Sequence, residues 1–135
     1  MASLTTDSDA QWPILEAAFL SRDHVALIRA LEAGVSPDAR DDCGSTLLMH
    51  ACGTADLATI FVLLAFGADW KLANWENEDA AGYLCAYNDK DEGSRLIVAR
   101  ALIGLAGNMW PAISAERGYK DSAISSGLME LANVL

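Results

Sequence analysis

Apolar residues recur along this chain at helical spacing, in short segments separated by polar turns. Residues 47–52 and 57–66 are two such segments, joined by a tight turn. The second segment ends at Gly67, and glycine readily adopts the left-handed conformation found at helix C-termini. A polar loop, residues 71–77, follows. The pattern predicts a helix–turn–helix unit with an extended loop after it.

The same pattern occurs earlier in the chain, where Ala18 and Gly34 align with Ala51 and Gly67 without a gap. The offset is the same for both pairs, and a fixed period of this size indicates stacked units. We therefore expect an all-α solenoid of helix–turn–helix units with short hairpin loops. The predicted boundaries are a single domain at 1–135, repeats at about 12–43, 44–76 and 77–108, and a degenerate cap at 109–135.

The third unit departs from this pattern. Glu78 and Asp79 precede an expected helix at 80–87, and their carboxylates suit a helix N-terminus. A longer connector leads to a second helix near 95–105. The residues expected to face the core on that helix are Leu96, Ile97, Ala101 and Leu102.

The pattern of residues 109–135 predicts a fourth unit that matches the repeat less well. Trp110-Pro111 mirrors Trp12-Pro13, and residues 115–119 predict a turn between two helices. Three apolar residues are expected to close the core, namely Leu128, Met129 and Leu131. A less regular last unit is expected because the end of a solenoid needs a polar outer face.

The second unit resembles the ankyrin repeat, whose pattern is Gly-x-Thr-Pro-Leu-His-x-Ala, two helices, Leu-Leu-x-x-Gly-Ala-Asp and a hairpin loop. The matching residues are Gly44, Thr46, Leu48, Ala51, Leu63, Leu64, Gly67, Ala68 and Asp69. The chain departs from the family at Leu47, where proline is expected, and at Met49, where histidine is expected. In the family, the threonine and histidine tie neighbouring repeats by hydrogen bonds. The resemblance therefore implies that apolar contact supplies more of the stability here.

The formal net charge of −10 disfavours non-specific attraction to nucleic acid or anionic lipid. It favours encounter with a basic protein, although a plain solubility surface explains it equally well. The start of the chain shows no secretory signal. The longest apolar run, residues 60–66, is too short to span a bilayer. We expect neither nucleic acid nor membrane as a partner.

Three cysteines, Cys43, Cys52 and Cys85, show no motif spacing. Cys52 and Cys85 are one period apart, at the small buried position of the first helix of each unit. They are expected to be core thiols in a reducing compartment, the cytoplasm. Neither the cysteines nor His24 and His50 have metal-ligand spacing. No nucleotide-binding or nucleophile motif is visible, so we expect no metal, no cofactor and no catalysis.

A binding surface is the functional feature that this fold predicts. Loop tips and outward positions of the first helices form a concave face in such a solenoid. The residues expected on that face are Arg40, Asp41, Asp42, His50, Asn74, Trp75, Glu76, Tyr83 and Tyr87. Trp75 is either an exposed anchor for a partner or packs locally on Leu72 or the third unit. Trp70 is expected in the core.

Carboxylates are concentrated around the inserted connector, where they form either a negative patch for a basic partner or a solvated face. Besides Glu76, the members of this expected acidic patch are Glu78, Asp79, Asp89, Asp91 and Glu92.

The sequence therefore predicts a non-catalytic protein-binding module. The sharpest hypothesis is an inhibitor, such as an immunity protein, that neutralises a partner with a basic surface. Two alternatives are a scaffold or chaperone subunit of a larger assembly, and an enzyme with an unrecognised site at Cys52.

Overall fold

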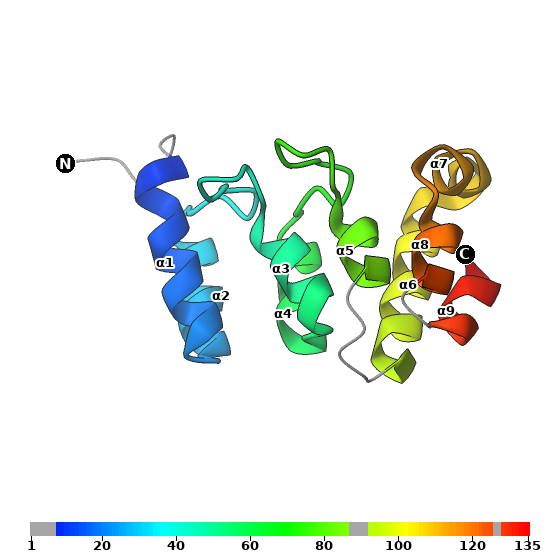
Figure 1. The fold of residues 1–135 in the computed structure, drawn as a ribbon. Helices are drawn as coiled ribbons and strands as arrows, with labels where there is room; N and C mark the ends of the chain where they lie inside the picture. The colour runs from blue at the N-terminus through cyan, green and yellow to red at the C-terminus, as the bar shows by residue number, and fades with distance from the viewer. Residues whose placement is uncertain (1–7, 87–91, 126–127) are drawn as a thin grey trace.

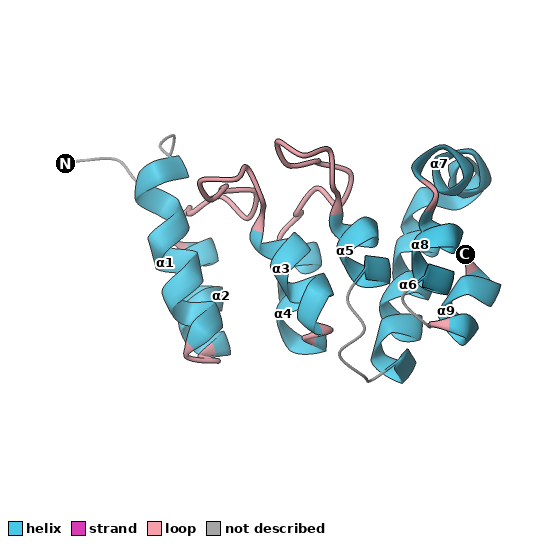
Figure 2. Cartoon of the chain, in the orientation of Figure 1, coloured by secondary structure: helices cyan, strands magenta, loops and turns pink. Residues whose placement is uncertain are grey.

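Helices dominate the computed structural model, which describes residues 8–86, 92–125 and 128–135 (Figure 2). Within these ranges there is no β-strand; two isolated bridges pair Arg40 with Thr46 and Ala73 with Asp79. The all-α prediction is confirmed for this part of the chain. The helices are α1 (Ser8–Leu20), α2 (His24–Glu32), α3 (Leu47–Thr54), α4 (Leu57–Ala65), α5 (Ala80–Ala86), α6 (Glu92–Ala106), the 3-10 turn η1 (Gly107–Met109), α7 (Trp110–Arg117), α8 (Tyr119–Ser125) and α9 (Met129–Val134).

The helices form an elongated stack of pairs (Figure 1). The pairs are α1 with α2, α3 with α4, α5 with α6, and α8 with α9. Helices α3, α5 and α8 pack side by side in one row, and α2, α4, α6 and α9 pack in a second row. Loops that connect the first three pairs lie together at one edge of the stack (Figure 1).

The first two pairs repeat each other in backbone conformation. Gly34 and Gly67, one period apart, both have positive φ, at 106° and 85°. Asp23 and Asp56 each cap the next helix by accepting a hydrogen bond from a backbone N–H three residues on. The two bridges in the loops are separated by the same period. The similarity inferred for these two units therefore extends to their turns and caps, while the division of residues 1–135 into repeats stays a prediction.

The core is apolar and runs through the whole stack. Leu15, Leu48, Leu84 and Leu131 come from four different helices and are almost fully buried. Each such leucine stabilises the fold by about 2 kcal/mol through the apolar surface removed from water. The expected core positions of Cys52, Cys85 and Trp70 are confirmed, as are those of Leu128 and Leu131.

The inward face of α6 differs in part from the prediction. Leu102 is buried as expected, but Ile97 is 49% exposed, and the other buried residues of the helix are Arg95, Val98 and Ala99. The Arg95 guanidinium donates hydrogen bonds to carbonyl oxygens at the ends of α3 and α5. These carbonyls belong to the last turns of the two helices, where carbonyl groups commonly need partners from outside the helix. A buried cation at two helix C-termini also suits the helix dipoles.

The tail keeps a fourth helix pair, but not the one predicted. Of the turn predicted at 115–119, only Gly118 lies between α7 and α8, and the pair that packs on α5 and α6 is α8 with α9. Helix α7 lies at the level of the loops, where the earlier pairs have a hairpin (Figure 1). Trp110 of α7 stacks on Tyr119, with ring centroids 5.5 Å apart. The resemblance of Trp110-Pro111 to Trp12-Pro13 therefore does not reflect equivalent positions.

One helical run, Glu92–Arg117, has the length and apolar composition of a membrane span. It comprises α6, η1 and α7. Its α6 part packs against α4, α5 and α9, and its Arg95 is buried within the protein. Its α6 part therefore belongs to the helical stack, and the absence of a membrane partner stays a prediction.

Candidate functional site

Three neighbouring rings come from α1, α3 and α5. Trp12 of α1 and His50 of α3 have ring centroids 5.6 Å apart, and His50 and Tyr83 of α5 are 5.9 Å apart. All three side chains are partly exposed. We call Trp12, His50 and Tyr83 the aromatic row. Because aromatic rings contribute large contact area at small entropic cost, such a row can serve as a contact surface for another protein.

His50 is held in place by Asp41 of the first loop. Its Nε2 lies 2.9 Å from Asp41 Oδ2, while Asp41 Oδ1 accepts hydrogen bonds from the backbone N–H groups of Cys43 and Ser45. Partial burial raises the pKa of Asp41. The hydrogen bonds from His50, Ser45 and Cys43 together lower it by more, so the pKa lies below its ordinary 3.8. The Asp41 carboxylate therefore links the loop to the ring on α3.

Tyr83 is held by the polar residues of both loops. Its hydroxyl lies 3.1 Å from Ser45 Oγ and accepts a hydrogen bond from Asn74 Nδ2 at 3.3 Å. Asn74 is only 5% exposed, so its expected place on the binding face is wrong. The Asn74 Oδ1 accepts hydrogen bonds from the N–H groups of Glu76 and Glu78, which fold the second loop. Asn74 therefore organises this loop and holds the Tyr83 hydroxyl by a hydrogen bond.

Trp75 packs on the first loop, a contact that the sequence did not predict. Its ring lies against Gly44, and the Arg40 guanidinium lies 5.1 Å from the ring centroid. Arg40 also donates hydrogen bonds to the carbonyl oxygens of Gly44 and Ala73, both at 2.8 Å. The indole is nevertheless 69% exposed. Trp75 and Arg40 thus connect two neighbouring loops, while the Trp75 ring remains accessible to a partner.

Polar contacts of Asp79 join the third helix pair to the tail, in addition to the expected apolar contact. Asp79 occupies the position of Thr46 one unit on, and its Oδ1 accepts a hydrogen bond from Gly82 N–H at the start of α5. Its Oδ2 accepts one from the Tyr119 hydroxyl and pairs with the Arg117 guanidinium at 3.2 Å. Burial and the hydrogen bond to Asp79 raise the pKa of Tyr119. Polar contacts therefore help apolar packing to hold the last helix pair, α8 with α9, against the rest of the stack.

The expected acidic patch is not brought together among the described residues. Glu76 and Glu78 are exposed on the second loop, but Asp79 is only 5% exposed and its inclusion in a surface patch is wrong. Glu92 accepts a hydrogen bond from Leu131 N–H, on the side of α6 that faces α9. The remaining predicted residues, Tyr87, Asp89 and Asp91, lie outside the described residues.

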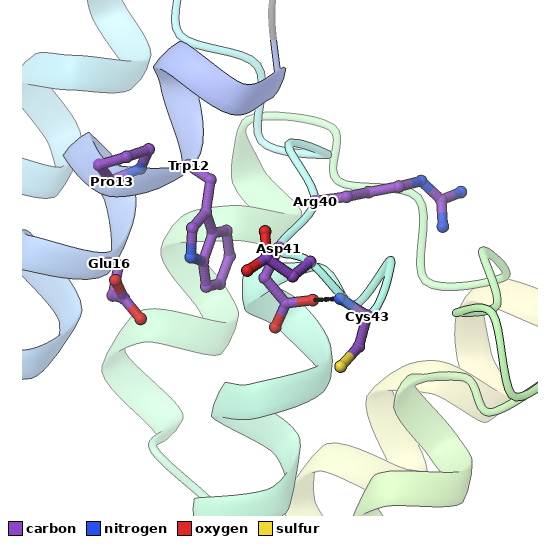
Figure 3. Close-up of a pocket in the computed structure, with 7 residues that line it drawn as sticks. Trp12, Pro13, Glu16, Arg40, Asp41 and Cys43 are labelled. Carbon is purple, nitrogen blue, oxygen red and sulfur yellow. Dashed lines mark hydrogen bonds between the residues drawn. The ribbon is translucent and has the colours of Figure 1, made fainter.

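A pocket of about 530 Å³ opens beside the aromatic row, between α1 and the first loop (Figure 3). The residues that line it are Trp12, Pro13, Glu16, Arg40, Asp41, Asp42 and Cys43. The sequence predicted Arg40, Asp41 and Asp42 on the binding face but not Trp12 or Glu16. The spacing of Trp12 and Glu16, one helical turn apart, is the signal that could have placed both on one face of α1.

The buried thiols of Cys52 and Cys85 are expected to be poor nucleophiles. Burial raises the pKa of Cys52 to about 12 and that of Cys85 to about 12. Both are therefore protonated near neutral pH, and the thiol is a poor nucleophile compared with the thiolate. Across the residues that the structure describes, no three His, Cys, Asp or Glu side chains cluster as metal ligands would.

No protein-family model matches the chain, and a search of curated proteins finds no significant relative.

Proposed function

We propose that this chain is a non-catalytic, ankyrin-type solenoid that binds and neutralises a protein with a basic surface. The observation that carries the proposal is the aromatic row, in which three rings on three neighbouring helices form one surface strip. Each support of the row comes from a loop: Asp41 holds His50, and Asn74 and Ser45 hold Tyr83. A strip fixed in advance binds with less loss of side-chain entropy.

The charge of the protein supports a basic partner. The formal net charge is −10, and the pocket beside Trp12 contributes three carboxylates next to the row. Opposite charge on a partner would speed association and select against acidic competitors. The periodic repetition of turns and caps supports the ankyrin-type assignment, because stacked repeats of this kind build extended binding surfaces. Three free cysteines fit a reducing compartment such as the cytoplasm.

Affinity capture with matched variants tests the proposal. His50→Ala removes the central ring of the row, and alanine preserves helix propensity. Phe61→Ala is the control, since Phe61 is 41% exposed on α4 in the other row of helices. We expect one basic protein to be recovered with the native chain and with Phe61→Ala, and to be reduced at least tenfold with His50→Ala. Equal recovery with both variants would count against the aromatic row as the binding surface.

A further inference from the structure

The pocket beside Trp12 is lined by three carboxylates and one cationic side chain, Arg40. Glu16 and Asp42 are exposed there, and Asp41 adds a third carboxylate. Arg40 is the cationic residue among those that line it. Its guanidinium is committed to the carbonyl oxygens of Gly44 and Ala73 and extends away from Trp12 (Figure 3). The pocket therefore has negative charge that its own residues do not neutralise.

The indole of Trp12 forms one wall of this pocket. It reaches from α1 toward the first loop, with Asp41 on one side and Glu16 on the other (Figure 3). Its ring is tilted by 47° to that of His50, which supports it from the α3 side. A cation over the face of an indole is attracted by the ring quadrupole, most strongly where water is excluded. An aromatic wall combined with free carboxylates is thus suited to a cationic group.

We propose that this pocket receives an arginine side chain of the partner protein. The proposal rests on the proposed function and specifies one contact within it. Arginine fits better than lysine because its flat guanidinium can stack on the Trp12 ring while its N–H groups pair with a carboxylate. Glu16 and Asp42 are the two carboxylates that would accept those hydrogen bonds. Asp41 keeps its bond to His50 and holds the wall in place.

A peptide titration observed by NMR tests the pocket directly. The probe is acetyl-Gly-Ser-Arg-Ser-Gly-amide, and its control has citrulline, which is uncharged and of the same shape, in place of arginine. We expect the arginine peptide to shift the indole N–H signal of Trp12 in a saturable manner and the citrulline peptide to leave it unchanged. Trp12→Leu assigns that signal by its loss.

Two double variants of equal charge change show whether the binding is local. Glu16→Gln with Asp42→Asn should weaken binding of the arginine peptide at least tenfold. Glu116→Gln with Asp121→Asn, at the other end of the stack, should leave the affinity within twofold. Equal responses to the two peptides would overturn the proposal. Equal weakening by the two double variants would do the same, because the attraction would then come from net charge alone.

The captured partner separates failure of this inference from failure of the proposed function. If Glu16→Gln with Asp42→Asn releases the partner as His50→Ala does, both stand. If only His50→Ala releases it, the aromatic row binds and the arginine pocket is wrong. If neither variant changes recovery, the proposed binding face is wrong, and the pocket inference falls with it.

Discussion

The Arg95 guanidinium of α6 donates a hydrogen bond to the carbonyl oxygen of Gly53, 42 residues earlier in the chain, at 2.7 Å. A second bond, to the Leu84 carbonyl, is also 2.7 Å long. One side chain thus joins the last turns of α3 and α5 to the second row of helices. Arg95 is fully buried, so these bonds form away from water, where an unmet carbonyl is costly.

Replacing Arg95 should destabilise the protein strongly. Arg95→Met keeps much of the apolar stem but leaves the carbonyls of Gly53 and Leu84 without their donor, and we expect a loss of about 3 kcal/mol in the free energy of unfolding. Arg100→Met is the control, since Arg100 is exposed on the same helix and should change stability by less than about 0.5 kcal/mol. Urea unfolding followed by circular dichroism measures both. Similar midpoints for the two variants would contradict the role of Arg95.

The contact between Asp79 and Tyr119 should stabilise the last helix pair. Tyr119→Phe removes only the hydroxyl that donates to the buried Asp79 carboxylate, and we expect a loss of about 2 kcal/mol. Hydrogen exchange should show faster opening in α8 and α9 than in α3 and α4. Glu116→Gln, an exposed substitution on α7, serves as the control. Unchanged exchange rates in α8 would show that apolar packing alone holds this pair.

Much of the fold follows from the sequence where the period is intact. Gly34 and Gly67 end equivalent helices, and Cys52 and Cys85 are buried as the period requires. The inward face of α6 could not be obtained in this way, because an insertion before it changes the phase of the helix. Arg95 faces the core since its partners are backbone carbonyls, which have no signature in the sequence.

The candidate site was predicted in part for the same reason. His50 and Tyr83 are one period apart and meet on neighbouring helices. The period does not predict Trp12, because the residue one period before His50 is Ala17. Trp12 lies more than one helical turn before Ala17, and its ring nevertheless reaches His50. Asn74 and Asp79 are polar residues that the sequence places at the surface. Their burial depends on partners from other units, such as Ser45 and Tyr119.

Gly44 should be intolerant of any side chain. Its φ of 78° is strained for other residues, and a Cβ there would overlap the indole of Trp75. We expect Gly44→Ala to lose about 2 kcal/mol of stability and to displace the ring, seen as a shift in the Trp75 indole N–H signal. Gly34→Ala is the control, with φ at 106° but no atom within 4 Å of the added Cβ. The double variant Gly44→Ala with Trp75→Ala should recover part of the loss, and full additivity would contradict the contact.

The pKa of Asp41 should depend on His50. Since its pKa in the folded protein lies below 3.8, Asp41 contributes stability that is present above about pH 4 and is lost as the pH falls through the lowered value. Carboxyl carbon NMR should place its titration midpoint below 3.8 in the native protein and higher in His50→Ala. His24→Ala, next to Asp56, is the control and should leave Asp41 unchanged. Equal midpoints for Asp41 in the native protein and His50→Ala would contradict the link.

The three thiols should differ sharply in reactivity. Cys43 is exposed, whereas burial raises the pKa of Cys52 to about 12 and that of Cys85 to about 12. Because the thiolate is the reactive form, an alkylating reagent at pH 8 should modify one thiol per native chain and three in guanidinium chloride. Mass spectrometry of peptides identifies the modified residue, and Cys43→Ser should reduce the native count to none.

The two buried thiols, Cys52 and Cys85, should make the protein less stable at alkaline pH. A pKa that is higher in the folded than in the unfolded protein contributes stability that is full below the unfolded value of 9.0 and declines as the pH rises toward about 12. The free energy of unfolding should therefore fall by up to about 1.4 kcal/mol per pH unit for each buried thiol in this range. Cys52→Ala should flatten that fall, while Cys43→Ser should leave it unchanged. Alkylation of native Cys52 at the rate of Cys43 would show instead that this part of the core opens readily to solvent.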